Sequence, residues 1–388
     1  MEQKLEVLPH LQHEEHIFTQ NFVPAWARHV KATPFTGLNL TYEIPYTELQ
    51  GLSYFVSPGI DGAEVDDRLV GIAHHHGRTV MLSWNSGIEI DGVDYSYLTQ
   101  KGGGYVTSGI DTDSDAFVPC ITQIRLGIEG GDPAGLLLYN MAKQDISITN
   151  LAARNGIRIV PIVGVSKLDE VILLNRRTGI NKLRGESNLL DDDDTPVLLY
   201  RAFVTPFRIE DLKPQDGTVL TDRNTFVSAN RTFMQFAFDI REDSSIPLEV
   251  RKSLIPKEIT QDVIDYCAEK GTYAYTINTY LNSILDHPGD PIEIDVLPYF
   301  DWYLSTITEQ FEKLHSLGIM HGFATQHNMT LDARLLDFDG AKYIEQDFYF
   351  NAEWASIEST AIALATYLKF IFNANVIDID EIMVKYFG

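Results

Sequence analysis

The sequence predicts an α+β fold of two lobes, for three reasons. The chain has 388 residues, more than a single ordinary hydrophobic core organises. Its first half holds short runs rich in β-branched and aromatic residues, separated by Gly, Asp and Asn turns. Its second half instead carries apolar residues at helical spacing. A chain whose strands come first in the sequence and whose helices follow is typical of an α+β domain.

The first half contains the predicted strands and one main helix. Residues 135–156 have helical spacing and end at Asn155-Gly156, while Asp91-Gly92 is a hairpin-turn pair. The predicted strands are 69–76, 78–84, 92–101, 157–165, 170–176 and 196–204. We therefore expect a strand-rich first lobe with a single principal helix.

The second half is predicted to be mostly helical. From Phe300 to Leu317 one face is apolar, and Gly318 ends the helix. The face consists of Phe300, Tyr303, Leu304, Ile307, Phe311 and Leu314. Further helices are expected over 259–270 and 361–372. With a boundary near Thr205–Asp216, we predict an N-terminal extension packing on the lobes, a nucleotide-binding N-lobe and a C-lobe. Their respective ranges are 1–65, 66–208 and 209–388.

Composition excludes several classes of function. With 30 basic and 55 acidic residues the net charge is -25, which repels nucleic-acid phosphates and anionic lipids. The longest strongly apolar run, 361–372, is 12 residues long and contains Lys369, too short to cross a bilayer. We expect no nucleic-acid and no membrane partner.

Two cysteines, Cys120 and Cys267, lie far apart in the sequence. This usage favours buried thiols in a reducing compartment over a disulfide framework or a zinc site. The opening residues lack the pattern of a secretion signal. We expect a cytoplasmic protein, with non-classical export left open.

The densest chemical signal is the segment 314–341. His321 follows the end of a helix, Asn328 comes seven residues later, and Asp337 nine residues after that. An amide oxygen and a carboxylate at the ends of adjacent short strands can bind one hard cation. The spacing is that of the protein-kinase catalytic loop and its magnesium aspartate, although Phe323 occupies the usual base position. The alternative is a hairpin with an Asn turn and a buried Asp.

Three cations are candidates for phosphate binding. Lys101 closes a predicted strand and precedes three glycines, where a backbone can approach a phosphate. Arg201 and Arg208 are seven residues apart near the expected lobe junction. Solvated lysine and ordinary ion pairs are the alternatives for these residues.

These segments, taken in order, resemble the selenoprotein O family of kinase-like proteins. The matching stretches are KGGG (101–104), NGIRIVPIVGV (155–165), LLYRAFVTPFRI (198–209) and LHSLGIMHGFATQHNMTLDARLLDFD (314–339). Gly77-Arg78 and the Asp91-Gly92 turn also resemble the nucleotide-loop hairpin of that family. The likeness extends, with gaps, over about residues 70–345. The family's C-terminal redox tail has no counterpart in the final residues IMVKYFG.

The resemblance implies a two-lobed protein-kinase-like fold that transfers AMP from ATP to protein hydroxyls. It implies Mg²⁺ (or Mn²⁺) on Asn328 and Asp337, with Asp337 also catalytic. The implied ATP-binding residues are Gly77, Arg78, Lys101, Asp145, Arg201 and Arg208.

Some positions depart from the family pattern. His327 stands where the family has an aspartate that is a candidate base, and it either accepts the hydroxyl proton or packs against the loop. Asp145 replaces a glutamate that pairs with the strand lysine, so this pair passes through water or is lost. His74, His75 and His76 occupy the nucleotide turn, as a metal cluster or as solvated histidines.

We therefore predict ATP- and Mg²⁺-dependent AMP transfer to a protein or peptide hydroxyl. Phosphotransfer is one alternative, since it needs the same metal pair. A catalytically inactive pseudokinase scaffold that binds a partner is the other, favoured by the acidic stretch after Lys101 and the histidine-filled turn.

Overall fold

A computed structural model shows how the chain folds and describes most of it. The described residues are 22–57, 59–73, 79–104, 135–173, 175–185, 190–213, 223–256, 294–344, 347–372 and 377–387. They form an α+β structure with one large antiparallel sheet. They group into two compact units, which are described separately. The first lies within Met1–Ile90, Tyr95–Arg154 and Val160–Phe203, and the second within Asp91–Asp94, Asn155–Ile159 and Val204–Gly388.

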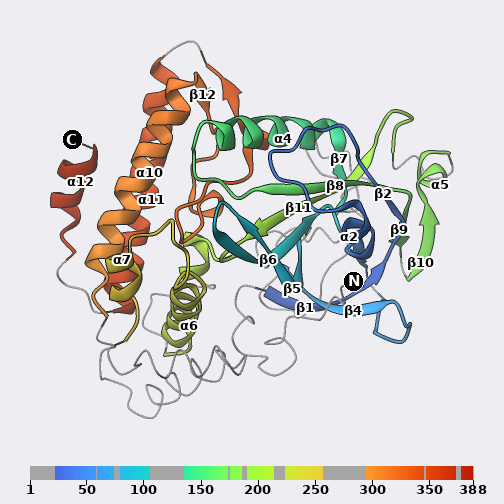
Figure 1. The fold of residues 1–388 in the computed structure, drawn as a ribbon, viewed down its shortest axis with the longest axis horizontal. Helices are drawn as coiled ribbons and strands as arrows, with labels where there is room; N and C mark the ends of the chain where they lie inside the picture. The colour runs from blue at the N-terminus through green and yellow to red at the C-terminus, as the bar shows by residue number, and fades with distance from the viewer. Residues whose placement is uncertain are drawn as a thin grey trace. The chain divides into compact units, whose positions relative to one another are not determined.

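The first unit is built on a nine-stranded sheet (Figure 1). The strands run in the order β2-β8-β11-β6-β5-β4-β1-β3, and β7 pairs with β11. Their bounds are β1 Phe22–His29, β2 Ala32–Pro34, β3 Tyr54–Val56, β4 Asp67–Ala73, β5 Thr79–Ile90, β6 Val93–Lys101, β7 Leu137–Leu138, β8 Ile162–Leu168 and β11 Pro196–Phe203. A hairpin of β9 (Glu170–Leu173) and β10 (Arg176–Gly179) stands apart from this sheet, and α2 (Tyr46–Gly51) and α5 (Ile180–Gly185) are short helices.

Strand β11 is an interior strand of the sheet, and its residues other than Arg201 are uncharged and mostly apolar. Every residue from Pro196 to Phe203 is buried, and β8 and β6 pair with it on either side. The β5–β6 hairpin turns at Asp91-Gly92, where both residues have positive φ (54° and 77°). That conformation suits a two-residue hairpin, as the sequence predicts.

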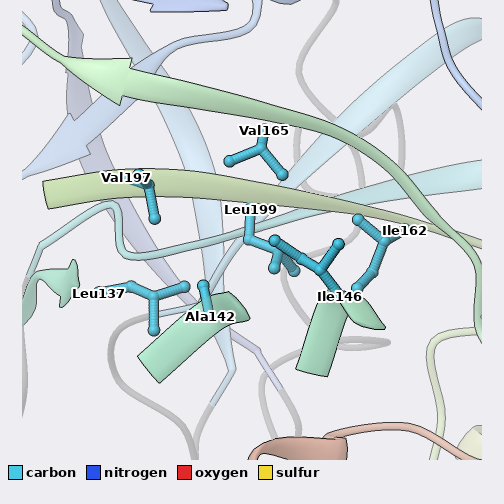
Figure 2. Packing of buried hydrophobic residues seen from close by; sticks show 7 residues of the cluster. All are labelled: Leu137, Ala142, Ile146, Ile162, Val165, Val197 and Leu199. Carbon is cyan, nitrogen blue, oxygen red and sulfur yellow. The ribbon is translucent and has the colours of Figure 1, made fainter. Parts of the chain in front are cut away.

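One face of the sheet is covered by α4, which spans Tyr139–Arg154 within the predicted segment 135–156. The side chains of this core point toward one another in Figure 2. They are Leu137, Ala142, Ile146, Ile162, Val165, Val197 and Leu199. Burying each large aliphatic side chain contributes about 1.5–3 kcal/mol, so this contact fixes the helix on the strands.

The second unit is mainly helical in its described residues (Figure 1). Its helices are α6 Arg223–Asp239, α7 Leu248–Ser253, α10 Leu297–Ser316, α11 Asp347–Ile371 and α12 Ile379–Phe387. A small two-stranded antiparallel sheet pairs β12 (Ile319–Met320) with β13 (Lys342–Tyr343). Three short 3₁₀ turns complete it: η2 Ile209–Leu212, η3 Gln326–Asn328 and η4 Phe338–Gly340.

Helix α10 confirms the helix predicted from Phe300 to Leu317. All six residues of the predicted apolar face are buried, together with Tyr299 and Gln310. Gly318 follows with a φ of 72°, and its N–H donates to the carbonyl of His315 (2.8 Å). The glycine is needed because a left-handed residue commonly ends a helix.

The other sequence predictions have different outcomes. The helix over 361–372 is the second half of α11. Strands β1, β2 and β3 were not predicted, although they belong to the main sheet. The segment 259–270 and both cysteines lie outside the described residues. No helix within the described ranges is both long and apolar enough to span a membrane.

Candidate active site

A tight hairpin in the second unit carries the predicted metal ligands. Met329 and Leu335 form an antiparallel bridge, and the Leu336 N–H donates to the Asn328 carbonyl (3.2 Å). Asn328 therefore lies opposite Leu336, the residue that precedes Asp337. The structure thus brings Asn328 and Asp337 to the same end of one hairpin, as their spacing predicts.

The side-chain amide of Asn328 is held in a fixed orientation. Its Nδ2 donates to the carbonyl of Phe323 (3.0 Å), and the residue is 8% exposed. Because this hydrogen bond uses the amide nitrogen, the amide oxygen points away from Phe323 and is the atom suited to bind a cation.

Asp337 has an uncommon backbone conformation. Its φ and ψ are 63° and 60°, the left-handed region, and it leads directly into η4. Aspartate enters this region more readily than most residues, at a cost of about 1–2 kcal/mol. Its Oδ2 lies 3.9 Å from Nη1 of Arg208, so a positive charge accompanies the carboxylate.

Arg208 connects the hairpin to η2. Its backbone N–H donates to Oδ2 of Asp211 (2.7 Å), which caps the 3₁₀ turn. Its Nη1 donates to the carbonyl of His327 (2.6 Å). The guanidinium therefore lies between the His327 carbonyl and the carboxylate of Asp337. Both residues are predicted from the sequence as part of the site.

The surrounding protein alters the ionisation of two groups beside Arg208. Burial lowers the pKa of the His327 imidazole; Glu210 opposes this shift, while Arg208 and Lys213 reinforce it. Nε2 of His327 lies 3.9 Å from Oε2 of Glu210. Asp211 keeps a partly exposed edge, yet burial of its carboxylate raises its pKa to about 7, against the hydrogen bond from Arg208.

His321 and Gly322 pack against the segment 336–340, which contains Asp337. The His321 ring is fully buried, lies against Phe338, and its Nε2 makes a hydrogen bond to the Leu336 carbonyl (2.9 Å). Gly322 has a φ of 87°, and a Cβ there would lie 2.3 Å from the carbonyl oxygen of Gly340. Only glycine fits this close approach without displacing the backbone.

Sequence reasoning missed Glu353, which anchors this loop from α11. Its Oε1 accepts the Gly322 N–H (2.8 Å), and its Oε2 accepts the His321 N–H (3.1 Å) and contacts Nε2 of His315 (2.7 Å). Helical spacing alone places Glu353 on a helix but cannot reveal which distant backbone its carboxylate meets.

Sequence reasoning also missed a buried ion-pair network under the hairpin turn. Asp243 lies 3.1 Å from both Arg158 and Arg334, and Arg158 also donates to the Asp332 carbonyl (2.8 Å). Burial alone would raise the pKa of Asp243, but the two guanidinium groups and the hydrogen bonds from Ser245 lower it. The network fixes the turn from Thr330 to Arg334.

The first unit holds the other predicted phosphate-binding residues. Lys101 on β6 lies directly opposite Leu199 on β11, so their side chains share a face of the sheet. Arg201 is two residues after Leu199 on the same strand, so it lies on that face as well. That face is covered by α4, because Leu199 packs against Ile146 in the same core cluster.

Asp145, on α4, forms a salt bridge with Arg201 on this face. Both side chains are almost completely buried, and Thr149 also donates to Asp145 (3.2 Å). The predicted pairing of Asp145 with Lys101, which is itself 6% exposed, stays a prediction.

The glycines after Lys101 are explained by packing within the first unit. A Cβ on Gly102 would lie 2.4 Å from the Val197 carbonyl oxygen, and one on Gly104 the same distance from that of Val56. The Gly103 carbonyl accepts the Val56 N–H (2.7 Å). The loop therefore needs three glycines to approach its own neighbouring strands.

Some predicted residues lie outside the described part of the chain. These are Gly77 and Arg78, the histidines at 74–76 and the acidic stretch that begins after Gly104. Within the described ranges, no group of three or more His, Cys, Asp or Glu side chains is placed to hold a metal ion. Asn328 and Asp337 together supply one amide and one carboxylate.

No protein-family model matches the chain, and no curated protein matches its sequence.

Proposed function

We propose that the protein is a kinase-like enzyme that binds ATP with Mg²⁺ and transfers AMP to a hydroxyl of a protein or peptide. The observation that carries the proposal is the arrangement around one hairpin end. Asn328 lies opposite Leu336 and Asp337 follows Leu336, with Arg208 3.9 Å from the Asp337 carboxylate. An amide, a carboxylate and a guanidinium in one place suit a cation bound to phosphate oxygens.

The donor set fits Mg²⁺ in particular. This ion is usually bound by one or two carboxylates, and it takes its other ligands from water and substrate phosphates. One carboxylate and one amide match that pattern better than a protein-only metal cage. When bound, the ion would neutralise the charge that develops on the transferring phosphoryl group.

The transfer itself is an in-line displacement. The acceptor oxygen bonds to the α-phosphorus, the bond from that phosphorus to the α,β-bridging oxygen breaks, and pyrophosphate leaves with the electron pair. Arg208 lies close enough to Asp337 to contact the same phosphates. His327 is half-exposed, and its lowered pKa leaves it neutral near pH 7, able to accept the hydroxyl proton.

Lys101, Asp145 and Arg201 are proposed separately as ATP-binding residues of the first unit. Support comes from the face that Lys101 and Arg201 share under α4. The buried Asp145–Arg201 pair would hold a guanidinium in place, while Lys101 would meet phosphate oxygens. Gly77 and Arg78 enter the proposal from the resemblance alone.

The test uses purified full-length protein, Mg²⁺ and ATP labelled separately at the α- and γ-phosphates. We expect protein-bound label from α-labelled ATP only, and its loss in Asp337→Asn. Glu309→Gln is the matched control, since it removes one exposed negative charge on α10. Label from γ-labelled ATP only would make the protein a kinase, and label that survives in Asp337→Asn would refute the metal assignment.

A scaffold without turnover is the second candidate, favoured by two observations in the first unit. The three glycines pack against their own strands, and Arg201 is buried against Asp145. Both features can stabilise a fold without any nucleotide. Under this proposal, ATP with Mg²⁺ would leave the melting temperature unchanged, because only a ligand that binds the folded state raises it.

A further inference from the structure

Phe323 lies between the two segments that carry the candidate metal ligands and is largely exposed. Its side chain is 57% exposed, whereas its neighbours His321 and Ala324 are buried. Its carbonyl accepts hydrogen bonds from Nδ2 of Asn328 (3.0 Å) and from the Thr325 N–H (2.9 Å). The backbone of Phe323 thus orients one candidate ligand while its ring faces solvent.

The ring of Phe323 also meets the turn that follows Asp337. A Cβ built on Gly340 would lie 2.3 Å from two ring carbons, so the ring lies directly over the Gly340 backbone. Gly340 ends the η4 turn that Asp337 begins. Phe323 is therefore in contact with both sides of the hairpin end.

The loop cannot easily withdraw this ring from solvent. Glu353 accepts the N–H groups of His321 and Gly322, and Ser356 donates to the Ala324 carbonyl (2.7 Å). Hydrogen bonds to α11 therefore hold the backbone on both sides of Phe323. Burying an exposed aromatic ring under a ligand contributes favourable free energy to binding. Because the backbone is already held in place, little conformational entropy is lost when the ligand binds.

We propose that Phe323 is a specificity-determining residue that contacts the acceptor, and that the acceptor is a peptide with an apolar or aromatic side chain beside the modified hydroxyl. This inference rests on the proposed function. Its position favours the acceptor over the nucleotide base, because bases bind in concave sites that enclose most of the ligand. A ring with one face on Gly340 and more than half its surface in water suits an extended peptide lying across it.

The experiment uses full-length protein, Mg²⁺, α-labelled ATP and an oriented peptide library with one fixed Ser, Thr or Tyr and mixed flanking residues. We expect the wild-type protein to select apolar or aromatic residues next to the hydroxyl. For a selected peptide, Phe323→Ala should raise KM about tenfold or more and change kcat little, since uniform binding is what is lost. Phe323→Leu, which keeps apolar contact with Gly340, should have a smaller effect in the same direction and guards against loss of folding.

Tyr343→Ala is the control, because Tyr343 is an exposed aromatic residue of β13 in the same unit. It should keep the wild-type selectivity. Labelling without apolar selectivity, or selectivity that survives in Phe323→Ala, would overturn the inference and leave AMP transfer intact. A weaker ATP-induced rise in melting temperature in Phe323→Ala would overturn it in favour of a nucleotide contact. No labelling of any peptide, with α-label still transferred to protein, would overturn this inference and leave the proposed function standing. No label on peptide or protein would refute both.

Discussion

The two groups of predicted phosphate-binding residues differ in what holds their charges. In the second unit, Asn328 is oriented by a backbone carbonyl, and Asp337 is 3.9 Å from the nearest guanidinium nitrogen of Arg208. In the first unit, Asp145 and Arg201 form a direct buried salt bridge. The Asp337–Arg208 ion pair is looser and its side chains are more exposed (11% each) than those of Arg201 and Asp145 (4% and 2%), so a ligand can reach it more easily. The comparison favours the hairpin of the second unit as the proposed place of metal binding and transfer. It gives the Asp145–Arg201 pair a role in stability beside its proposed place in the ATP site.

The largest expected effect is on transfer activity at Asp337. Asp337→Asn removes the charge of a candidate Mg²⁺ ligand and keeps the shape of the side chain, so activity should fall by about 10²–10³-fold or more. Activity is measured as α-label transfer, and stability by urea unfolding. Wild-type activity in Asp337→Asn would contradict the proposal that the hairpin of the second unit carries the chemistry.

The next effect is on the free energy of unfolding of the first unit. Arg201→Met leaves the Asp145 carboxylate buried without its guanidinium, which should cost about 3–5 kcal/mol. Combining it with Asp145→Leu should restore most of that loss, because a buried pair replaced by apolar residues is often close to neutral. Denaturant unfolding of both variants checks this. If Arg201→Met kept wild-type stability, the pair would not stabilise the first unit. A loss of ATP binding in that variant would then leave Arg201 with only its proposed role in the ATP site.

A smaller effect is expected where α11 holds the loop of His321 and Gly322. Glu353→Gln keeps the size of the side chain but replaces one acceptor oxygen with an amide, which should cost about 1–3 kcal/mol. Hydrogen exchange should rise at the amides of His321 and Gly322, which donate to this carboxylate. Unchanged exchange at both amides would show that the anchor contributes little.

The smallest effect concerns pH and Asp211. Its pKa is raised to about 7, so the contribution it makes to stability is fully present at about pH 4 and is lost as pH rises through 7. Asp211→Asn should therefore be more stable than wild type at pH 8, by roughly 1 kcal/mol once solvent screening at its exposed edge is allowed for, and should lose that advantage below about pH 4. Urea unfolding at both pH values measures this difference, and an equal difference at each would show that Asp211 does not titrate in this range.

Local patterns predicted α4, α10 and the second half of α11 because their information is local, whereas α6 and α12 were not predicted. The apolar face of α10 repeats every three or four residues, and Gly318 marks its end, so both follow from neighbouring residues. The hairpin at Asn328 and Asp337 also follows from a short spacing. Glu353 could not be predicted, since its partners His321 and Gly322 lie about thirty residues away and meet it only in the folded chain.

The strands of residues 22–56 show a different reason for failure. β2 and β3 are each three residues long, too short for alternation to be recognised. β1 contains Pro24, which argues against a strand when judged from sequence alone. Pairing with β4 and β8 supplies what the local sequence does not. The same holds for the Asp145–Arg201 pair, which depends on α4 covering the face of β11.

The central claim is that Asn328 and Asp337 bind a cation that carries ATP. Isothermal titration calorimetry of Mn²⁺-ATP tests this most directly on the wild-type protein, Asp337→Asn and Glu309→Gln. We expect binding by the wild-type protein and by Glu309→Gln, and an affinity at least about tenfold weaker in Asp337→Asn, the loss of one charge-assisted contact. Equal affinity in all three proteins, or no binding by the wild-type protein, would contradict it.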